Sequence, residues 1–243
     1  MKRTILLPLA LLFFYTGSFA QGAVNNKLDN FTGNGYAGAA FSEMRKKLNT
    51  PSDLETVGSV YIDDRFLPCT VYYNDEAIGD FYYRHNAFND EVEIKDTQLG
   101  EEPESSLATI KELRLVDGKD NKELALKAYQ NKKDIVRNGY LYQLHDGEKY
   151  DLFFKNNVKY TEGTHPINSM VKATPNKFSH FTDFYFMKNG DKLAYYIEHK
   201  KSQFLREFEK DKRDSLASYI KEEKINLRKE EDLMKVFTYL NSI

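Results

Sequence analysis

Residues 139 to 154 read GYLYQLHDGEKYDLFF, and this stretch decides the fold. Its apolar residues alternate with polar ones, which is the pattern of strands that bury one face. The alternating apolar residues are Tyr140, Tyr142 and Leu144 on the outward run and Tyr150, Leu152 and Phe154 on the return. Between the two runs, Asp146-Gly147 is typical of a tight turn. The stretch therefore predicts two antiparallel strands joined as a hairpin.

Two further stretches repeat this arrangement on either side. Residues 181 to 197, FTDFYFMKNGDKLAYYI, have a turn signal at Asn189-Gly190. Residues 65 to 74, RFLPCTVYYN, and 78 to 88, IGDFYYRHNAF, are aromatic and β-branched runs with a plausible turn between them. Consecutive strands joined by tight turns predict an antiparallel meander rather than a parallel α/β sheet.

After His199 the spacing of the apolar residues changes to that of helices. Three groups predict short helices, namely Phe204, Leu205 and Phe208; Leu216, Tyr219 and Ile220; and Leu233, Val236, Phe237 and Leu240. Acidic and basic residues are interleaved between these groups, which is typical of a solvated helical face. We expect these helices to close one end of the sheet.

The sequence thus predicts an α+β fold: an antiparallel β-meander that forms a curved sheet or partial barrel, with a small C-terminal helical subdomain. The expected order is a signal peptide at 1–20, a leader and short helix at 21–56, an antiparallel β domain at 57–199, and at 200–243 a helical subdomain packed on the sheet. Within the β domain, residues 100 to 106, GEEPESS, are expected to form an acidic loop.

The first twenty residues, MKRTILLPLALLFFYTGSFA, have the layout of a secretory signal peptide. A basic start precedes an apolar run, and Ser18-Phe19-Ala20 places small residues where signal peptidase needs them. The apolar run is shorter than the roughly 20 residues that a membrane-spanning helix requires. The mature protein is therefore expected to be exported, periplasmic or secreted, and to have no transmembrane segment.

Composition narrows the class of partner. Without Lys2 and Arg3 of the leader, 33 basic residues face 37 acidic ones, a net charge of −4. Because nucleic-acid binders concentrate basic charge on one face, no nucleic-acid partner is expected. Cys69 is the single cysteine of the chain, so no intramolecular disulfide can form.

Motifs for catalysis and for metal or cofactor binding are missing from the sequence. No two of the five histidines are two to four residues apart, and no HExxH, GxSxG or phosphate-binding glycine loop occurs. Cys69 lies inside a predicted strand, and a buried apolar filler explains it better than a nucleophile that needs a histidine base. The sequence therefore predicts no catalytic, cofactor-binding or metal-binding residue, no cofactor, and a protein that is not an enzyme.

One charged stretch, residues 81 to 96, FYYRHNAFNDEVEIKD, most resembles a reactive site. As a hairpin it places Arg84 beside a glutamate, Glu91 or Glu93, of the opposite strand, which is an ordinary cross-strand ion pair. We therefore interpret it as a structural hairpin with a charged outer face. On that interpretation the ion pair is exposed, and replacement of His85 by phenylalanine is tolerated.

Several short patterns resemble a family of uncharacterised secreted or periplasmic proteins of Bacteroidota. The family pattern runs GS-x-Y, R-x-N, DE-x-E, KEEDL and Y-x-NS. The matching segments here are residues 58–61, 84–86, 90–93, 229–233 and 239–243, and in the second a histidine replaces the aromatic residue usual in the family. The resemblance implies export and a shared fold, and it supplies no site residue.

Two functions from different classes follow from these observations. The first is a non-enzymatic envelope protein that binds another protein or a surface component through its sheet. The second is a carrier of an apolar small molecule in a cavity of the curved sheet, capped by the C-terminal helices. A pocket lined by Phe and Tyr favours the carrier, and a filled core favours the binding module. A hydrolase with a dispersed site ranks third.

The signal peptide gives a first prediction. The exported protein is expected to begin at Gln21, because signal peptidase cleaves after the small residue Ala20. N-terminal sequencing of the protein recovered from the cell exterior or periplasm measures this. A chain that starts at Met1 and fractionates with membranes would contradict it.

Overall fold

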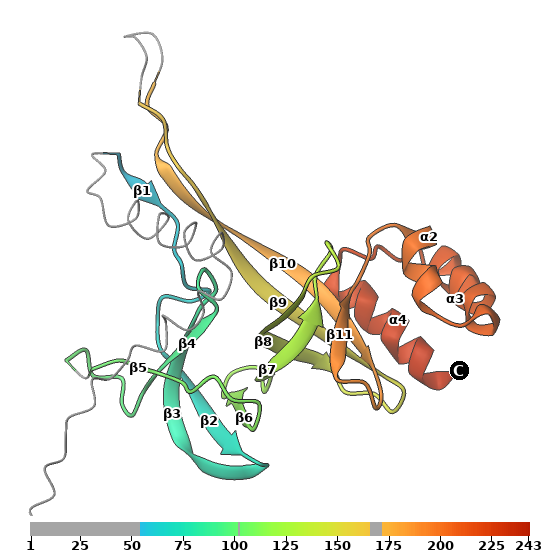
Figure 1. Ribbon diagram of the computed structural model, residues 1–243, viewed down its shortest axis with the longest axis horizontal. Coiled ribbons are helices and arrows are strands. Elements are labelled where there is room, and N and C mark those ends of the chain that lie inside the picture. Colours follow the sequence, from blue (N-terminus) through green and yellow to red (C-terminus); the bar gives the residue numbers. More distant parts are fainter. Residues whose placement is uncertain (1–53, 102, 166–171) are drawn as a thin grey trace, which may run out of the picture. The chain divides into compact units, whose positions relative to one another are not determined.

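One curved sheet and a set of short helices make up the described chain (Figure 1). The computed structural model describes residues 54 to 243, apart from residue 102 and residues 166 to 171. The strands are β1 (Thr56–Val57), β2 (Leu67–Tyr73), β3 (Glu76–Asn86), β4 (Glu91–Lys95), β5 (Ser105–Ser106), β6 (Leu113–Asp117), β7 (Glu123–Gln130), β8 (Val136–His145), β9 (Tyr150–Thr161), β10 (Asn176–Lys188) and β11 (Leu193–Tyr196). The helical segments are α2 (Lys201–Phe204), η2 (Leu205–Glu207), α3 (Lys210–Glu222) and α4 (Glu230–Ser242). The signal peptide and the helix expected near residues 36–48 lie outside the described residues.

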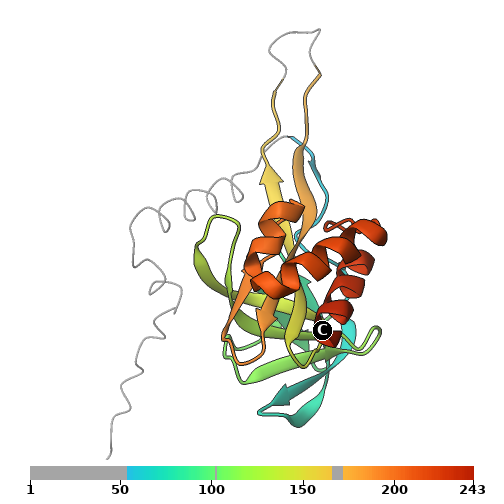
Figure 2. The ribbon, with the colours of Figure 1, turned by 90° about the vertical axis from the view of Figure 1, so that its right-hand side faces the viewer.

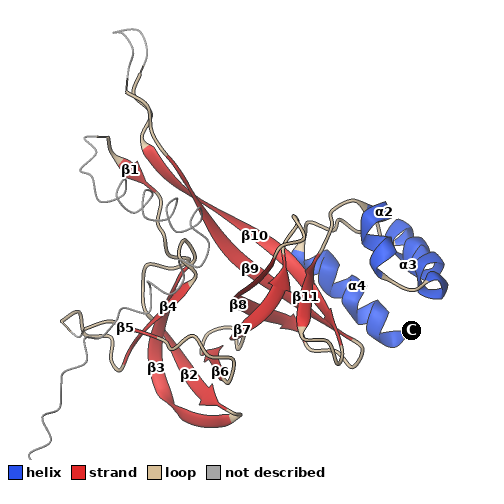
Figure 3. Ribbon diagram, viewed as in Figure 1, coloured by secondary structure: helices blue, strands red, loops and turns tan. Residues whose placement is uncertain are grey.

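The sheet is a meander that closes on itself at one end. Its strand order is β1-β10-β9-β8-β7-β6-β2-β3-β4-β5, and β11 pairs with both β10 and β7. The five strands β7 to β11 therefore form a ring (Figure 3). The expected α+β fold with a curved sheet or partial barrel is confirmed. The sheet is mixed, however, because β1 runs parallel to β10 and β11 parallel to β7.

The hairpin turns form where the sequence places them. Asn74 and Asp75 connect β2 to β3 with φ of 48° and 66°, and positive φ at both central residues matches the right-handed twist of hairpin strands. Gly190, with φ of 88°, lies between β10 and β11. Strands β6 and β7 are not singled out by the sequence pattern. Their residues, LRLVD and ELALKAYQ, are rich in good helix formers, and pairing with neighbouring strands overrides that preference.

The inside of the ring is filled by side chains. Each of the five strands contributes one buried residue to a single contacting cluster, in the order Tyr129, Leu141, Phe153, Tyr185 and Ala194. Phe153 and Leu141 have no exposed surface. Close packing of large rings around the axis leaves the ring a core rather than a cavity.

The helices cover the opposite face of the ring strands, as Figure 2 shows with α2, α3 and α4 in front of the sheet. Phe237 of α4 lies against Phe186 of β10, with ring centroids 5.9 Å apart. Asn241 fixes the end of α4 to the sheet, because its side-chain oxygen accepts hydrogen bonds from the backbone N–H groups of Lys149 and Tyr150 at 2.8 and 3.0 Å. This approach requires Gly147, since a Cβ there would overlap the Asn241 amide.

The docking of α4 gives a second prediction. Replacing Phe237 by alanine is expected to lower the free energy of unfolding by about 3 kcal/mol or more, because the ring is fully buried and leaves a cavity. Chemical denaturation measures the loss. Phe181→Ala is the matched control, because the Phe181 side chain is 47% exposed and its removal should have little effect. Equal stability of the wild type and Phe237→Ala would show that α4 contributes nothing to the core.

Candidate functional site

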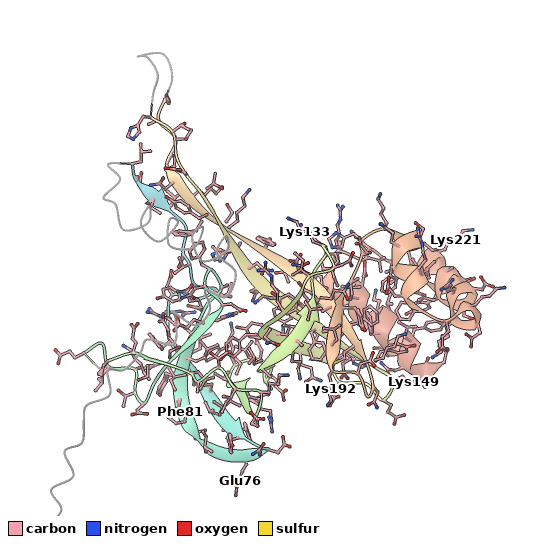
Figure 4. All side chains as sticks on the ribbon, viewed as in Figure 1. Glu76, Phe81, Lys133, Lys149, Lys192 and Lys221 are labelled. Atoms are coloured by element: carbon pink, nitrogen blue, oxygen red, sulfur yellow. The ribbon has the colours of Figure 1, made fainter. Side chains whose placement is uncertain are left out.

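The β3–β4 hairpin presents different chemistry on its two faces. In its register Arg84 lies opposite Glu93, and His85 opposite Val92. Side chains of neighbouring residues point to opposite faces of a strand, so Arg84 and His85 enter different surroundings. Figure 4 labels Glu76, the first residue of β3, and Phe81, near its middle; Arg84 and His85 follow Phe81 along the strand. The predicted cross-strand pairing of Arg84 with a glutamate is confirmed.

On the outer face, the guanidinium of Arg84 contacts two aromatic rings. Its guanidinium carbon lies 3.9 Å from the centroid of Tyr61 and 4.6 Å from that of Phe66. Guanidinium groups are attracted to the negative faces of aromatic rings, and the attraction increases when water is excluded. Both rings come from the irregular segment between β1 and β2, which therefore fixes the orientation of the arginine.

Two carboxylates complete the contacts of Arg84. Its Nε donates to Glu93 at 2.6 Å, and its Nη2 donates to Glu104 at 2.8 Å. Tyr61 donates its hydroxyl hydrogen to the other oxygen of Glu93 at 3.1 Å. Burial, followed by the negative charge of Glu93, raises the pKa of Tyr61 to about 12, so the hydroxyl stays a donor. Glu93 is thus fully engaged by groups that belong to the fold.

The expectation of an exposed ion pair is wrong. The side chains of Arg84 and Glu93 are only 16% and 15% exposed. Sequence alternation correctly assigns both residues to the outer face of the hairpin. That face is then covered by Tyr61 and Phe66, which come from outside the hairpin and carry no periodic signal. A largely buried pair differs in energy from an exposed one, because removing one partner leaves the other charge desolvated.

A second cation lies beside Arg84. The side chain of Lys95 is 7% exposed, and its ammonium lies 4.7 Å from the centroid of Phe66. Among the described residues, Glu104 is its one ion-pair partner, with 4.0 Å between Nζ and Oε1. Glu104 itself is 42% exposed. Two buried cations therefore converge on a single, half-exposed carboxylate.

These groups line a pocket of about 480 Å³ that opens to solvent. Arg84, Lys95, Phe66 and Glu104 are among its lining residues. We refer to Tyr61, Phe66, Arg84, Glu93, Lys95 and Glu104 together as the Arg84 site. The site offers cationic hydrogen-bond donors and a ring face, and its tyrosine hydroxyl stays protonated.

On the inner face, His85 belongs to a buried polar network. Its Nε2 lies 3.2 Å from an oxygen of Asp90, and its Nδ1 lies 3.3 Å from the hydroxyl of Tyr142. A carboxylate can only accept, so Nε2 carries the hydrogen and Nδ1 accepts from Tyr142. Near Tyr142, the hydroxyl of Tyr83 donates to Asp117 at 2.5 Å.

Asp90 joins this network to the ring strands. Its carboxylate lies 2.5 Å from the ammonium of Lys155 on β9 and accepts from the backbone N–H of Tyr140 on β8 at 3.3 Å. Gly139 leaves the room for this approach, since a Cβ there would lie 2.5 Å from Asp90 Oδ2. Asp90 adopts a φ of 58°, which directs its side chain back under the hairpin.

Electrostatics keep the network in one protonation state. Burial lowers the pKa of His85, more than the neighbouring Asp90 carboxylate raises it, and the imidazole is neutral. Burial raises the pKa of Asp90, but the His85 hydrogen bond and the Lys155 charge outweigh it, so the carboxyl is ionised. His85 is 2% exposed, and a general acid or base must reach its substrate. The network therefore holds strands together rather than serving a reaction.

Other residues singled out by the sequence lie apart from both clusters. Cys69 is 4% exposed, and burial raises the pKa of its thiol to about 12, which fits an inert filler. In residues 54–243 without 102 and 166–171, no three His, Cys, Asp or Glu side chains are placed to hold a metal ion. No helix within the same residues has the length and apolarity needed to cross a membrane.

Comparison of the chain with protein-family models, curated proteins and solved structures finds no match.

The inner network gives a third prediction. His85→Phe keeps the ring volume, but it leaves Asp90 without one donor and Tyr142 without its acceptor. Each group stranded in this way costs about 1 to 3 kcal/mol. We therefore expect a lower free energy of unfolding than in the wild type, measured by denaturation at pH 8. This replaces the expectation that the substitution is tolerated.

The same variant tests the protonation of His85. In the wild type, the unfolded chain takes up a proton at His85 below about pH 6.5, whereas the folded chain resists it because its pKa is lowered. Stability should then fall with pH by up to about 1.4 kcal/mol per unit in this window. In His85→Phe this part of the loss should vanish, with His180→Gln on an exposed histidine as control. An unchanged pH slope would contradict the assignment.

Proposed function

We propose that the protein is an exported, non-enzymatic binding module of the cell envelope that recognises another protein or a surface component. Export is supported by the signal-peptide pattern of the first twenty residues. The binding surface we propose is the Arg84 site on the outer face of the β3–β4 hairpin.

One observation carries this proposal: two cations of low exposure contact the same aromatic ring in the lining of an open pocket. Arg84 and Lys95 both contact Phe66, and each is less than one-fifth exposed. Arginines held by packing lose little freedom on binding, and buried arginines and aromatic residues dominate the energetics of protein interfaces. A site of this kind is suited to binding a partner without further rearrangement.

The alternative of an apolar carrier has less support. A carrier needs an enclosed apolar space, and the inside of the ring is occupied by the contacting cluster of Tyr129, Leu141, Phe153, Tyr185 and Ala194. Both described pockets open to solvent, and charged residues are prominent in their lining. The filled core therefore favours the binding module.

The proposal gives a fourth prediction. Arg84→Met should abolish capture of the envelope partner in crosslinking from intact cells, because methionine keeps the packing but removes every donor. Arg114→Met is the matched control. Arg114 also stacks on a ring, that of Tyr72 at 4.0 Å, and pairs with two acids, but it lies on β6 and lines neither described pocket.

The outcomes separate the candidate functions. A partner captured by the wild type and Arg114→Met but lost with Arg84→Met supports the Arg84 site. Equal capture by all three proteins would place the binding surface elsewhere. An apolar molecule that is released by organic extraction from the purified native protein, in stoichiometric amount, would favour the carrier instead.

A further inference from the structure

The geometry points to a carboxylate as the group that the Arg84 site binds, with the Glu104 side chain competing for the same two cations. This inference rests on the proposed function and gives the ligand its chemical class. The partner would present an acidic side chain, a chain terminus or a sugar acid, each of which carries the same planar, singly charged group.

Glu104 shows how a carboxylate fits. Its two oxygens face two different cations: Oε2 lies 2.8 Å from Nη2 of Arg84, and Oε1 lies 4.0 Å from Nζ of Lys95. The second distance is too long for a hydrogen bond, which needs about 2.7 to 3.2 Å. Glu104 therefore accepts a hydrogen bond from Arg84 but lies too far from Lys95 to accept one from its ammonium. We infer that an external carboxylate, which is not held by the chain as Glu104 is, places one oxygen on each cation.

The charge of the site favours a monoanion. Glu93 belongs to the fold, because it accepts from Arg84 Nε and from the Tyr61 hydroxyl. Arg84, Lys95 and Glu93 together carry a charge of +1, which one carboxylate neutralises. A phosphate dianion would overcompensate this charge and lie beside Glu93, where like charges repel.

Glu104 is a weak competitor. Its side chain is 42% exposed, and ion pairs accessible to water contribute little. It is nevertheless tethered to the site, so it competes at a high effective concentration. Removing its charge should strengthen binding of an external carboxylate by about fivefold, the factor that corresponds to ~1 kcal/mol for an exposed pair.

The test is an NMR titration that follows the Arg84 Nε–H and the Lys95 side-chain signals. The probes are a capped peptide with three glutamates, its glutamine counterpart, an uncapped neutral peptide with a free C-terminus, a galacturonic acid trimer and inorganic phosphate. We expect at least one carboxylate probe to shift both signals, while the glutamine peptide and phosphate leave them unchanged. The three carboxylate arms distinguish side chain, terminus and sugar acid as the source.

Variants make the result specific. Glu104→Gln should lower the apparent Kd about fivefold, and Glu101→Gln, which removes the same charge from an exposed neighbour, should leave it unchanged. Lys95→Met should weaken binding of the carboxylate probe at least tenfold. It also provides the test of the site if Arg84→Met does not fold. Binding of the glutamine peptide or phosphate at equal strength, or no carboxylate binding even to Glu104→Gln, would overturn the inference. In the latter case, capture of a partner that still depends on Arg84 would leave the proposed function standing.

Discussion

The ionised carboxylate of Asp90 is only 25% exposed, and groups from three strands neutralise and hydrogen-bond it. Lys155 of β9 supplies a charge, His85 of β3 a ring donor and Tyr140 of β8 a backbone N–H. Buried charges are tolerated only when each is paired and hydrogen-bonded, and removing one partner is costly. Asp90 lies in the β3–β4 turn, directly before β4, so this requirement ties the β3–β4 hairpin to the ring strands β8 and β9.

This constraint also fixes what the outer face presents. A slip of one residue along β3 would exchange every inward side chain with an outward one. With His85 committed to Asp90 and Tyr142, Arg84 must point outward, and the pairing of Tyr82 with Lys95 places the lysine on the same face. The positions of both cations in the Arg84 site thus follow from polar contacts on the opposite side of the sheet.

Local patterns predicted much of the fold and less of the site. Alternation and turn residues located the hairpin strands β2, β3, β8, β9, β10 and β11, and the spacing of Phe237 and its neighbours located α4. Alternation also predicted that Arg84 faces a glutamate of the opposite strand, and the structure identifies it as Glu93. Alternation cannot show which residues from elsewhere in the chain contact each face of the hairpin. Phe66 and Glu104 come from irregular segments, and Lys155 is distant from Asp90 in the chain, so nothing in the sequence joins them. The polar contacts of His85 are hidden from the sequence for the same reason, since they depend on Tyr142 of another hairpin.

The two stacked arginines of the sheet, Arg84 and Arg114, differ in the charges around them. Arg114 lies over Tyr72 and faces two carboxylates, Asp75 and Glu123, so its single charge is already overcompensated. Around Arg84 the charges are arranged differently, because Glu93 belongs to the fold and offsets one of the two cations, which leaves a net charge of +1 opposite Glu104. A fold that needed only to neutralise Arg84 had no use for Lys95, whose burial beside a like charge costs free energy. We infer that an external carboxylate contacting both cations offsets this cost.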